Sequence, residues 1–349
     1  MASGSRGWVS LGESFGSCVV TRQPSSATAA LRDDLTPVVE ANLNRHLRIA
    51  QEWMPHEYVP WSQGTNFDGV LGGQAWEPGQ SKLSEVARTS LILNLLTEDN
   101  LPSYHHATAT QVGLAGAWGA WLHRWTAEEG RHGQAIRDYL LCTRAVDPIA
   151  LERARMEHVS GGFSNDYAQR GLAHSIAYVT FQELATRIAH RNTGRYSGDP
   201  VCEQLLTRIA HDENLHMVFY RDLLGAVLDL YPDLGMRAVC DVAKTFQMPG
   251  SVMANFTRKS VQIARAGIYD LRIHRDEVLL PVLRTLKVLD RTGLSADGER
   301  AREEMVAFLA DLDRAATRFS ERRDAARERI ANRPPDPSAD PDLLSPSST

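Results

Sequence analysis

The sequence lacks any apolar run that could cross a membrane, and cysteine is scarce in it. No stretch approaches the ~20 uninterrupted apolar residues of a membrane helix, and the N-terminus has no apolar core of a signal peptide. The four cysteines form no C-x-x-C pair, which argues against both a disulfide framework and a cysteine-rich zinc site. We therefore expect a soluble, cytoplasmic protein.

An excess of positive charge is also missing. The 38 lysines and arginines stand against 43 aspartates and glutamates, so the formal net charge is −5. Such a chain has no electrostatic footprint for nucleic acid, and an acidic partner would have to bind a local basic patch. With 43% hydrophobic and 23% charged residues, the composition is that of a globular protein with enough apolar material for one large core.

Strand-like alternation is nearly absent, whereas apolar residues recur at helical spacing through most of the chain. Thr36 and Pro37 form a helix-start signal, and Pro232 and Gly235 mark a break. Several of the helices would exceed twenty residues, and long helices with short connections favour an antiparallel bundle. The expected helices cover residues 37–51, 81–107, 115–143, 147–158, 166–193, 199–229, 235–246, 251–266, 270–291 and 295–327.

The two ends of the chain differ in composition from its middle. Residues 1–30 mix Gly, Ser and Thr without a period, and residues 331–349 are rich in Pro, Ser and Asp, so neither end can bury enough apolar area to offset its ordering entropy. We expect a flexible leader at 1–30, a single domain at 31–330 and a disordered tail at 331–349. Residues 56–80, with five glycines and two tryptophans, are expected to form an extended loop over the bundle.

Two E-x-x-H motifs occur, at Glu129–His132 and at Glu213–His216, where composition alone predicts fewer than one. Each lies within a long expected helix, so the i,i+3 spacing places its two side chains on one face. That face is otherwise apolar. A carboxylate and an imidazole would thus be carried into a core, where an unpaired charge is costly unless a counter-ion or a metal balances it.

A further glutamate precedes each motif at nearly the same distance. Glu98 lies 31 residues before Glu129, and Glu183 lies 30 residues before Glu213. If the helical hairpins turn near residues 110–114 and 194–198, each lone glutamate and its motif lie at one level of two adjacent antiparallel helices. Four carboxylates and two histidines would then converge, as in the ferritin-like di-iron and di-manganese carboxylate proteins.

We therefore predict a ferritin-like four-helix bundle core with additional flanking helices and a two-metal site inside it. Carboxylates suit hard, redox-active ions such as iron, and the imidazoles leave coordination positions open for dioxygen. Zinc prefers fewer ligands, often with sulfur. A single buried Glu or His is more often a satisfied core residue, but six in register favour the metal. The predicted ligands are Glu98, Glu129, His132, Glu183, Glu213 and His216.

Residues next to the ligands form a second group of candidates. A ligand histidine needs an acceptor for its other ring nitrogen, so we expect Asp212 to reach the histidine of the opposite motif, with Glu128 placed alike in the other half. Thr186, one turn after Glu183, joins the candidate catalytic residues. Structural capping or solvation explains these three residues equally well. Trp125 is expected to border the site by packing. The remaining histidines of interest are expected at the surface or in the core: His105, His106, His123, His190 and His211.

The segments W-T-A-E-E-G-R-H-G at 125–133 and H-D-E-N-L-H at 211–216 look like the two iron motifs of the soluble acyl-[acyl-carrier-protein] desaturases. Five further segments resemble that family in the same order along the chain: L-T-E-D-N-L-P-S-Y, T-F-Q-E-L-A-T, H-R-N-T, Q-M-P and T-G-L-S-A-D-G. The resemblance covers roughly residues 36–325. It implies that Glu98 and Glu183 are terminal ligands, that Glu129 and Glu213 bridge two irons, and that His132 and His216 supply the imidazoles.

The resemblance also implies a reaction. A reduced iron pair activates dioxygen, two hydrogens leave a saturated acyl chain on acyl carrier protein, and a cis double bond results. Ferredoxin or a similar donor supplies the electrons, and the family's Trp-Asp-His route corresponds here to Trp53, Asp212 and His132. A homodimer with one site per subunit is implied as well. For the acidic carrier, Arg272 and Arg275 are candidate docking residues.

Two other functions stay open. The same oxidant could hydroxylate or otherwise oxidise a carrier-bound acyl or polyketide chain, because the position of the C–H bond decides the product. Alternatively, the chain could be a ferritin-like iron-binding protein without turnover. The complete ligand set favours an enzyme.

Overall fold

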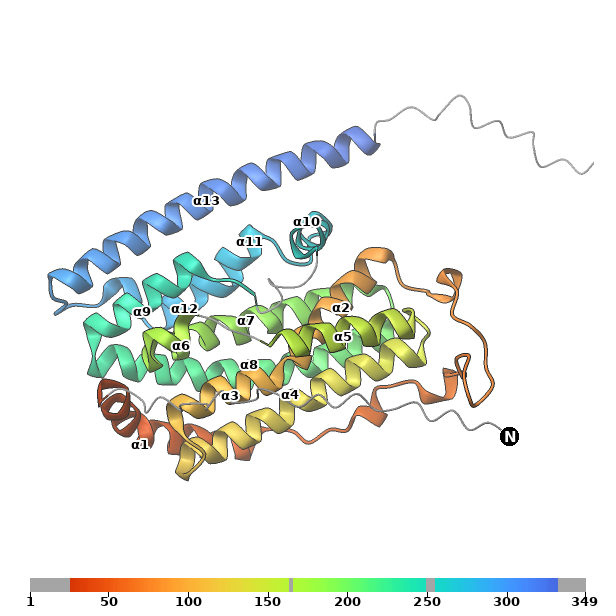
Figure 1. Ribbon diagram of the computed structural model, residues 1–349. Coiled ribbons are helices and arrows are strands. Elements are labelled where there is room, and N and C mark those ends of the chain that lie inside the picture. Colours follow the sequence, from red (N-terminus) through yellow and green to blue (C-terminus); the bar gives the residue numbers. More distant parts are fainter. Residues whose placement is uncertain (1–25, 163–165, 249–254, 332–349) are drawn as a thin grey trace, which may run out of the picture.

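The structure is a computed structural model that describes residues 26–162, 166–248 and 255–331, and these ranges are almost entirely helical (Figure 1). No β-strand occurs in these ranges, so the all-α prediction is confirmed. The α-helices are α1 (Ser26–Ile49), α2 (Glu85–Asp99), α3 (Leu101–Val112), α4 (Gly116–Cys142), α5 (Pro148–Gly161), α6 (Asp166–Arg170), α7 (Leu172–Ser197), α8 (Pro200–Leu230), α9 (Pro232–Thr245), α10 (Phe256–Ala266), α11 (Leu271–Ile273), α12 (Leu280–Thr285) and α13 (Ala296–Ala331).

Helices α2, α4, α7 and α8 form a four-helix core. α2 packs against α4 and α7, and α8 packs against the same two helices, so the four close a ring. α1 lies against α4 and α8, α9 covers α7 and α8, and α13 packs on the outside of α9 (Figure 1). The two hairpin turns fall at residues 113–115 and 198–199, close to the predicted positions.

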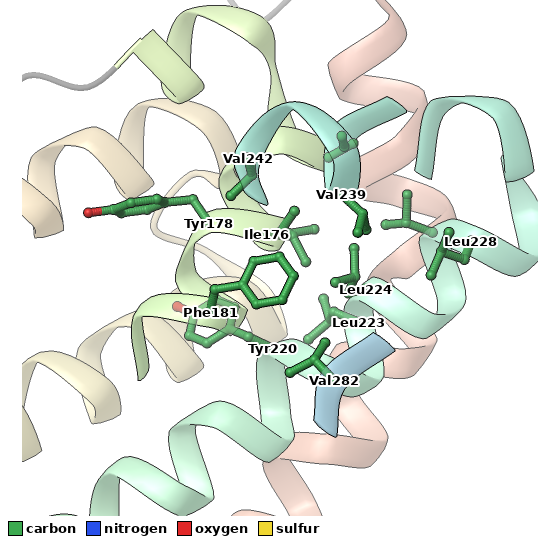
Figure 2. Packing of buried hydrophobic residues seen from close by; sticks show 14 of the residues in the cluster. Ile176, Tyr178, Phe181, Tyr220, Leu223, Leu224, Leu228, Val239, Val242 and Val282 are labelled. Atoms are coloured by element: carbon green, nitrogen blue, oxygen red, sulfur yellow. The ribbon is translucent and has the colours of Figure 1, made fainter. Parts of the chain in front are cut away.

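Two apolar clusters lie along the bundle with a polar layer between them. In α4, Trp121 belongs to one cluster and Tyr139 to the other, on either side of the first E-x-x-H motif. In α8, Phe219 and Ile209 flank the second motif in the same way. Figure 2 shows part of the first cluster, where Phe181 of α7 packs among side chains of α8 and α9. The motifs are therefore held between two dry cores, away from water.

Gly133 brings α2 close to α4 at the level of the first motif. A Cβ atom added at Gly133 would lie 3.2 Å from the Cβ atom of Glu98, tighter than most real contacts of this kind. A larger residue would push α2 outward and carry Glu98 away from the motif in α4. The glycine that follows His132 thus helps to set the distance between two helices of the core.

α1 begins earlier than the sequence predicts. It starts at Ser26, inside the expected leader, and Pro37 lies within the helix instead of at its first position. The Thr36 hydroxyl donates to a carbonyl one turn earlier and does not cap the helix. Leu31 and Leu35 are buried against the bundle, and this apolar stripe outweighs the hydrogen bond that Pro37 cannot make. Residues 1–25 and 332–349, most of the expected leader and tail, lie outside the described residues.

The helix expected at 81–107 is in fact two helices. α2 ends at Asp99 and α3 begins at Leu101. Pro102 has no N–H to donate to the carbonyl of Glu98, and the N–H of Asn100 bonds to that carbonyl instead. The helix that carries Glu98 therefore ends one residue after it.

Three other segments differ from the prediction. Residues 270–291 form α11, a π-helical turn (His274–Leu279), α12 and a 3₁₀ turn (Val288–Asp290) instead of one helix, because Pro281 cannot donate to a regular helix. Residues 166–193 are divided at Gly171, whose φ of 104° favours glycine. Pro232 begins α9, and Gly235 lies inside it, where a Cβ atom would meet Leu228 at 2.8 Å. The loop at 56–80 contains the 3₁₀ turns Trp61–Gln63 and Pro78–Gln80.

Candidate metal centre

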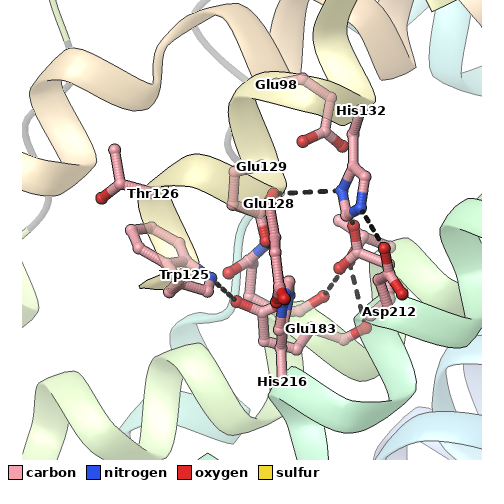
Figure 3. A network of polar contacts seen from close by, with 12 residues as sticks. Glu98, Trp125, Thr126, Glu128, Glu129, His132, Glu183, Asp212 and His216 are labelled. Carbon is pink, nitrogen blue, oxygen red and sulfur yellow. Dashed lines mark hydrogen bonds and ion pairs between the residues drawn. The ribbon is translucent and has the colours of Figure 1, made fainter. Parts of the chain in front are cut away.

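Six buried side chains from the four core helices converge in the polar layer (Figure 3). They form two groups that share Glu129 and Glu213. Glu98 and His132 complete the first group, and Glu183 and His216 complete the second. Within each group, one oxygen or ring nitrogen per residue lies within 4.8 Å of the others. The structure thus brings together all six residues that the sequence singles out.

The atoms that face one another in this cluster are not satisfied by the protein. In the described part of the chain, five of them make no well-aligned hydrogen bond, although His216 Nδ1 lies only 2.8 Å from Glu129 Oε1. The five atoms are Glu129 Oε1, His132 Nδ1, Glu183 Oε2, Glu213 Oε1 and His216 Nδ1. Orphaned polar atoms at this depth are costly, and carboxylate oxygens with imidazole nitrogens are the donors that iron and manganese accept. Four carboxylates also carry four negative charges, which two divalent cations would balance. The residues therefore fit a pair of metal ions.

Burial and mutual repulsion shape the protonation of the carboxylates. Burial, followed by the charges of Glu129 and Glu213, raises the pKa of Glu98 well above its usual range. The same causes raise the pKa of Glu183. Burial also opposes ionisation of Glu129, but the close approach of the His132 and His216 rings outweighs it and lowers the pKa of Glu129. Glu98 and Glu183 are therefore the two carboxylates that burial and repulsion make hardest to ionise.

The outer nitrogen of His132 faces the carboxylate of Asp212. His132 Nε2 lies 3.3 Å from Asp212 Oδ2, and the indole N–H of Trp53 donates to the same oxygen at 2.7 Å. Arg131 Nη2 donates to that oxygen at 2.8 Å, and Arg208 donates to Oδ1. Burial alone would raise the pKa of Asp212, but His132, Trp53 and Arg208 lower it well below its usual range. Asp212 is thus an anionic acceptor that fixes the orientation of His132.

The outer nitrogen of His216 is held by Glu128 in the same way. His216 Nε2 lies 2.8 Å from Glu128 Oε2, while Arg124 Nε donates to Oε1 at 2.5 Å. His46 Nε2 lies 3.1 and 3.2 Å from the two carboxylate oxygens. Burial opposes ionisation of Glu128, but its two histidine partners lower its pKa well below the usual range. With both outer nitrogens occupied, each ligand histidine presents Nδ1 to the cluster.

Three more side chains touch the carboxylates of the cluster. Thr186 Oγ1 donates to Glu213 Oε2 at 2.8 Å, and Trp125 Nε1 donates to Glu183 Oε1 at 3.1 Å. His190 Nε2 lies 3.0 Å from Glu98 Oε1. From the sequence, His190 is expected to be a surface or core histidine without a role in the site. In the structure it is buried beside a cluster carboxylate, and burial lowers its pKa to about 4.

Sequence reasoning missed several of these neighbours, although some had a signal. Arg124 and Arg208 each lie four residues before their acidic partner, Glu128 or Asp212, so both pairs occupy one face of a helix. His190 lies seven residues after Glu183, on the same face of α7. His46 had no such signal, because its partner is 82 residues away in sequence.

An apolar cavity lies beside the cluster. Its wall includes Trp125, which donates to Glu183, and Gln182, the residue before Glu183. From there the lining extends to Leu172 in α7 and to Trp118 in α4. The ten residue-to-residue steps from Leu172 to Gln182 correspond to ~15 Å along α7. None of the helices in the described part of the chain is long and apolar enough to span a membrane.

Comparison with known proteins agrees with this geometry. Residues 28–333 match the family model described as fatty acid desaturase. DesA1 of Mycobacterium tuberculosis, named as an acyl-[acyl-carrier-protein] desaturase, is 50% identical over 295 residues, which cover 83% of this chain and 87% of that protein. The chloroplastic stearoyl-[acyl-carrier-protein] 9-desaturase 5 of Oryza sativa is 28% identical over 311 residues, covering 84% and 78%.

A solved structure supports the same assignment. The X-ray structure of DesA2 from Mycobacterium tuberculosis H37Rv, named as an acyl-ACP desaturase, superposes with a TM-score of 0.62 at 32% identity. The match covers 74% of this chain and 95% of DesA2. The ferritin-like all-α fold predicted from the sequence is thereby confirmed. Both the family model and these relatives extend over most of the chain, and the chain belongs to the fatty acid desaturase family.

Proposed function

We propose that this protein desaturates a saturated acyl chain carried as a thioester on acyl carrier protein, with dioxygen and external electrons, and forms a cis double bond. The observation that carries the proposal is the apolar cavity whose wall includes Trp125, the side chain that donates to Glu183 of the six-residue cluster. The carrier is inferred from the names of DesA1 and of the rice desaturase.

The cluster would hold two irons. Glu129 and Glu213 belong to both groups and would help to hold both ions, whereas Glu98 and Glu183 each belong to one group and would help to hold one ion. When bound, the iron pair would supply, with dioxygen, the oxidising power that removes two hydrogens from an unactivated chain. Asp212 and Glu128 would keep His132 and His216 turned with Nδ1 toward the ions.

The cavity would bind the acyl chain and position it for oxidation. Its wall is formed largely by apolar side chains, among them Leu172, Ile176, Val179 and Trp118. Burial of methylene groups against such a wall stabilises the complex by ~0.8 kcal/mol per CH₂. The wall also excludes water and fixes which carbon lies beside the cluster, which decides where the hydrogens are removed.

Electrons would reach the site through Trp53, Asp212 and His132. These three residues are joined by hydrogen bonds, and the indole of Trp53 stacks on the His132 ring with centroids 6.2 Å apart. An external ferredoxin-like donor would bind on this side of the bundle.

The docking residues expected for an acidic carrier are engaged elsewhere. Arg272 donates to Asp313 at 2.5 Å, and Arg275 pairs with Asp276. Both guanidinium groups are therefore largely neutralised by carboxylates of this chain, which disfavours Arg272 and Arg275 as the carrier surface. The homodimer stays a prediction.

The test is incubation of the iron-loaded protein with ferredoxin, a reducing system, oxygen and a panel of acyl-carrier thioesters, followed by mass analysis of the acyl group. Loss of two hydrogens is the expected result. Gain of one oxygen atom would instead assign a hydroxylase. No change across the panel, with iron bound, would leave an iron-binding protein and contradict the proposal. Glu213→Ala is the matched control, since it removes one bridging carboxylate.

A further inference from the structure

We propose that His46 of α1 is a positioning residue for the ligand His216 and acts through Glu128. This inference rests on the metal-binding part of the proposed function. It assigns to α1, a helix outside the four-helix core, a direct part in the geometry of the metal site.

The contacts of His46 lead to a single polar group. Its side chain is 3% exposed, and its Nε2 lies 3.1 and 3.2 Å from the two oxygens of Glu128. Glu128 in turn lies 2.8 Å from Nε2 of His216. An ionised carboxylate only accepts hydrogen bonds, so His46 must donate from Nε2. The carboxylate is therefore held between two imidazoles, one of which belongs to the metal cluster.

The ring of His46 also packs directly on the ring of His216. It stacks on the His216 ring with centroids 6.0 Å apart and an angle of 26° between the planes. Its edge contact with Trp121 has a centroid distance of 5.1 Å at 84°. The indole of Trp121 makes a similar edge contact with His216, at 6.0 Å. The plane of the His216 ring is thus confined by two neighbours, while Glu128 fixes its outer nitrogen.

Anchoring of α1 alone would not call for an imidazole. Leu35 and Val39 already bury that helix against the bundle without exposing any side-chain surface. In the described part of the chain, His46 Nδ1 lacks a hydrogen-bond partner, which is a cost that an apolar residue at position 46 would avoid. The hydrogen bond from Nε2 of His46 to Glu128 explains why a histidine occupies this position.

A matched set of variants tests the proposal by metal binding, with no need for turnover. His46→Leu removes the donor, His46→Phe removes the donor but keeps a ring against His216, and His46→Gln keeps an N–H donor at a similar reach. Asn42→Leu is the control, because Asn42 is buried one turn earlier in α1 and bonds only to a carbonyl of its own helix. Cobalt(II) is titrated anaerobically into each apo-protein, and the visible absorption of the bound ion is recorded.

We expect His46→Leu and His46→Phe to weaken cobalt binding by about 10-fold, the lower end of the effect of losing the outer partner of a ligand, because Glu128 itself remains, and to change the absorption of the ion. His46→Gln should restore most of the affinity, and Asn42→Leu should bind as the wild type does. In a Glu128→Gln background, His46→Leu should add no further loss, since its effect passes through Glu128.

Two results would overturn the proposal. Wild-type cobalt affinity in both His46→Leu and His46→Phe would show that His46 does not act on the site. An equal loss in Asn42→Leu would show that disturbance of α1 packing alone explains the effect. If the wild-type protein bound no cobalt, the proposed two-metal site itself would fail, and that outcome is distinct from a failure confined to the variants. Should His46→Leu not fold, as judged by circular dichroism, the comparison of His46→Phe with His46→Gln answers the same question.

Discussion

The two halves of the metal centre each orient one histidine, but they use different side chains to do so. On one side, Asp212 holds His132 and is itself held by Trp53. On the other, Glu128 holds His216 and is itself held by His46. In both halves the acidic residue directly precedes a shared glutamate of the cluster, and an arginine four residues earlier pairs with it.

The halves differ in how their charges are compensated. Asp212 accepts from Arg208, whose side chain is 8% exposed, and from Arg131, at 17%. Glu128 accepts from Arg124, whose side chain is 40% exposed and can reach water. An indole can also carry an electron, whereas His46 offers an imidazole in the equivalent place. The same orientation of a histidine is thus achieved twice, but only in the Asp212 half does an indole donate to the acidic residue that holds the histidine.

The largest effect should come from the residues that both halves share. Glu213→Ala removes an oxygen donor from both groups, so the protein should lose stoichiometric iron altogether. Glu98→Ala alters only the first group and should leave the second able to bind. Metal analysis after gel filtration measures the ratio of iron to protein. Stoichiometric iron in Glu213→Ala would contradict the assignment of this residue as a bridge.

The two halves should also differ in how much their acidic residue contributes to the stability of the apo-protein. Asp212→Asn leaves two mostly buried guanidinium groups without a counter-ion and should destabilise the apo-protein by ~3–5 kcal/mol. Glu128→Gln frees the more exposed Arg124, which can be solvated, so the loss should be smaller, ~1–2 kcal/mol. Urea unfolding of both variants measures the difference. Equal losses, or the reverse order, would show that solvent access does not distinguish the halves.

The two halves should also differ in their contribution to electron delivery. Trp53→Phe removes the indole but leaves Arg131 and Arg208 to hold Asp212, so metal affinity should change little while reduction of the loaded protein by ferredoxin becomes slower. The matched control is Trp125→Phe, which also removes an indole that donates to a carboxylate near the metal, in this case Glu183. Stopped-flow reduction measures the rate. An unchanged rate in Trp53→Phe would remove this residue from the electron path.

The smallest effect is expected at Thr186, which donates to Glu213 at 2.8 Å. Thr186→Val keeps the shape of the side chain but loses this hydrogen bond. The free energy of unfolding of the apo-protein should therefore fall by ~1 kcal/mol. Thr186→Ser should retain it. Urea unfolding distinguishes the two, and identical stabilities would mean that the hydroxyl contributes no net stabilisation.

The sequence was most informative where the spacing within helices decides the geometry. Glu98, Glu129, Glu183 and Glu213 could be placed at one level because hairpin turns and the helical rise fix their heights. His46 could not be found in this way, because the packing of α1 across α4 and α8 is set by distant contacts. Proline signals are ambiguous: Pro37 predicts a helix start, but burial of an apolar stripe continues α1 through it. Pro102, in contrast, did break a helix that periodicity alone had made continuous.

The most direct test is the number and position of metal ions in the protein. We predict two irons per chain by metal analysis, and two anomalous scattering peaks in an iron-loaded crystal, both within bonding distance of Glu129 and Glu213. One peak would be held by Glu98 and His132, the other by Glu183 and His216. A single iron per chain, or ions bound away from these six side chains, would contradict the account.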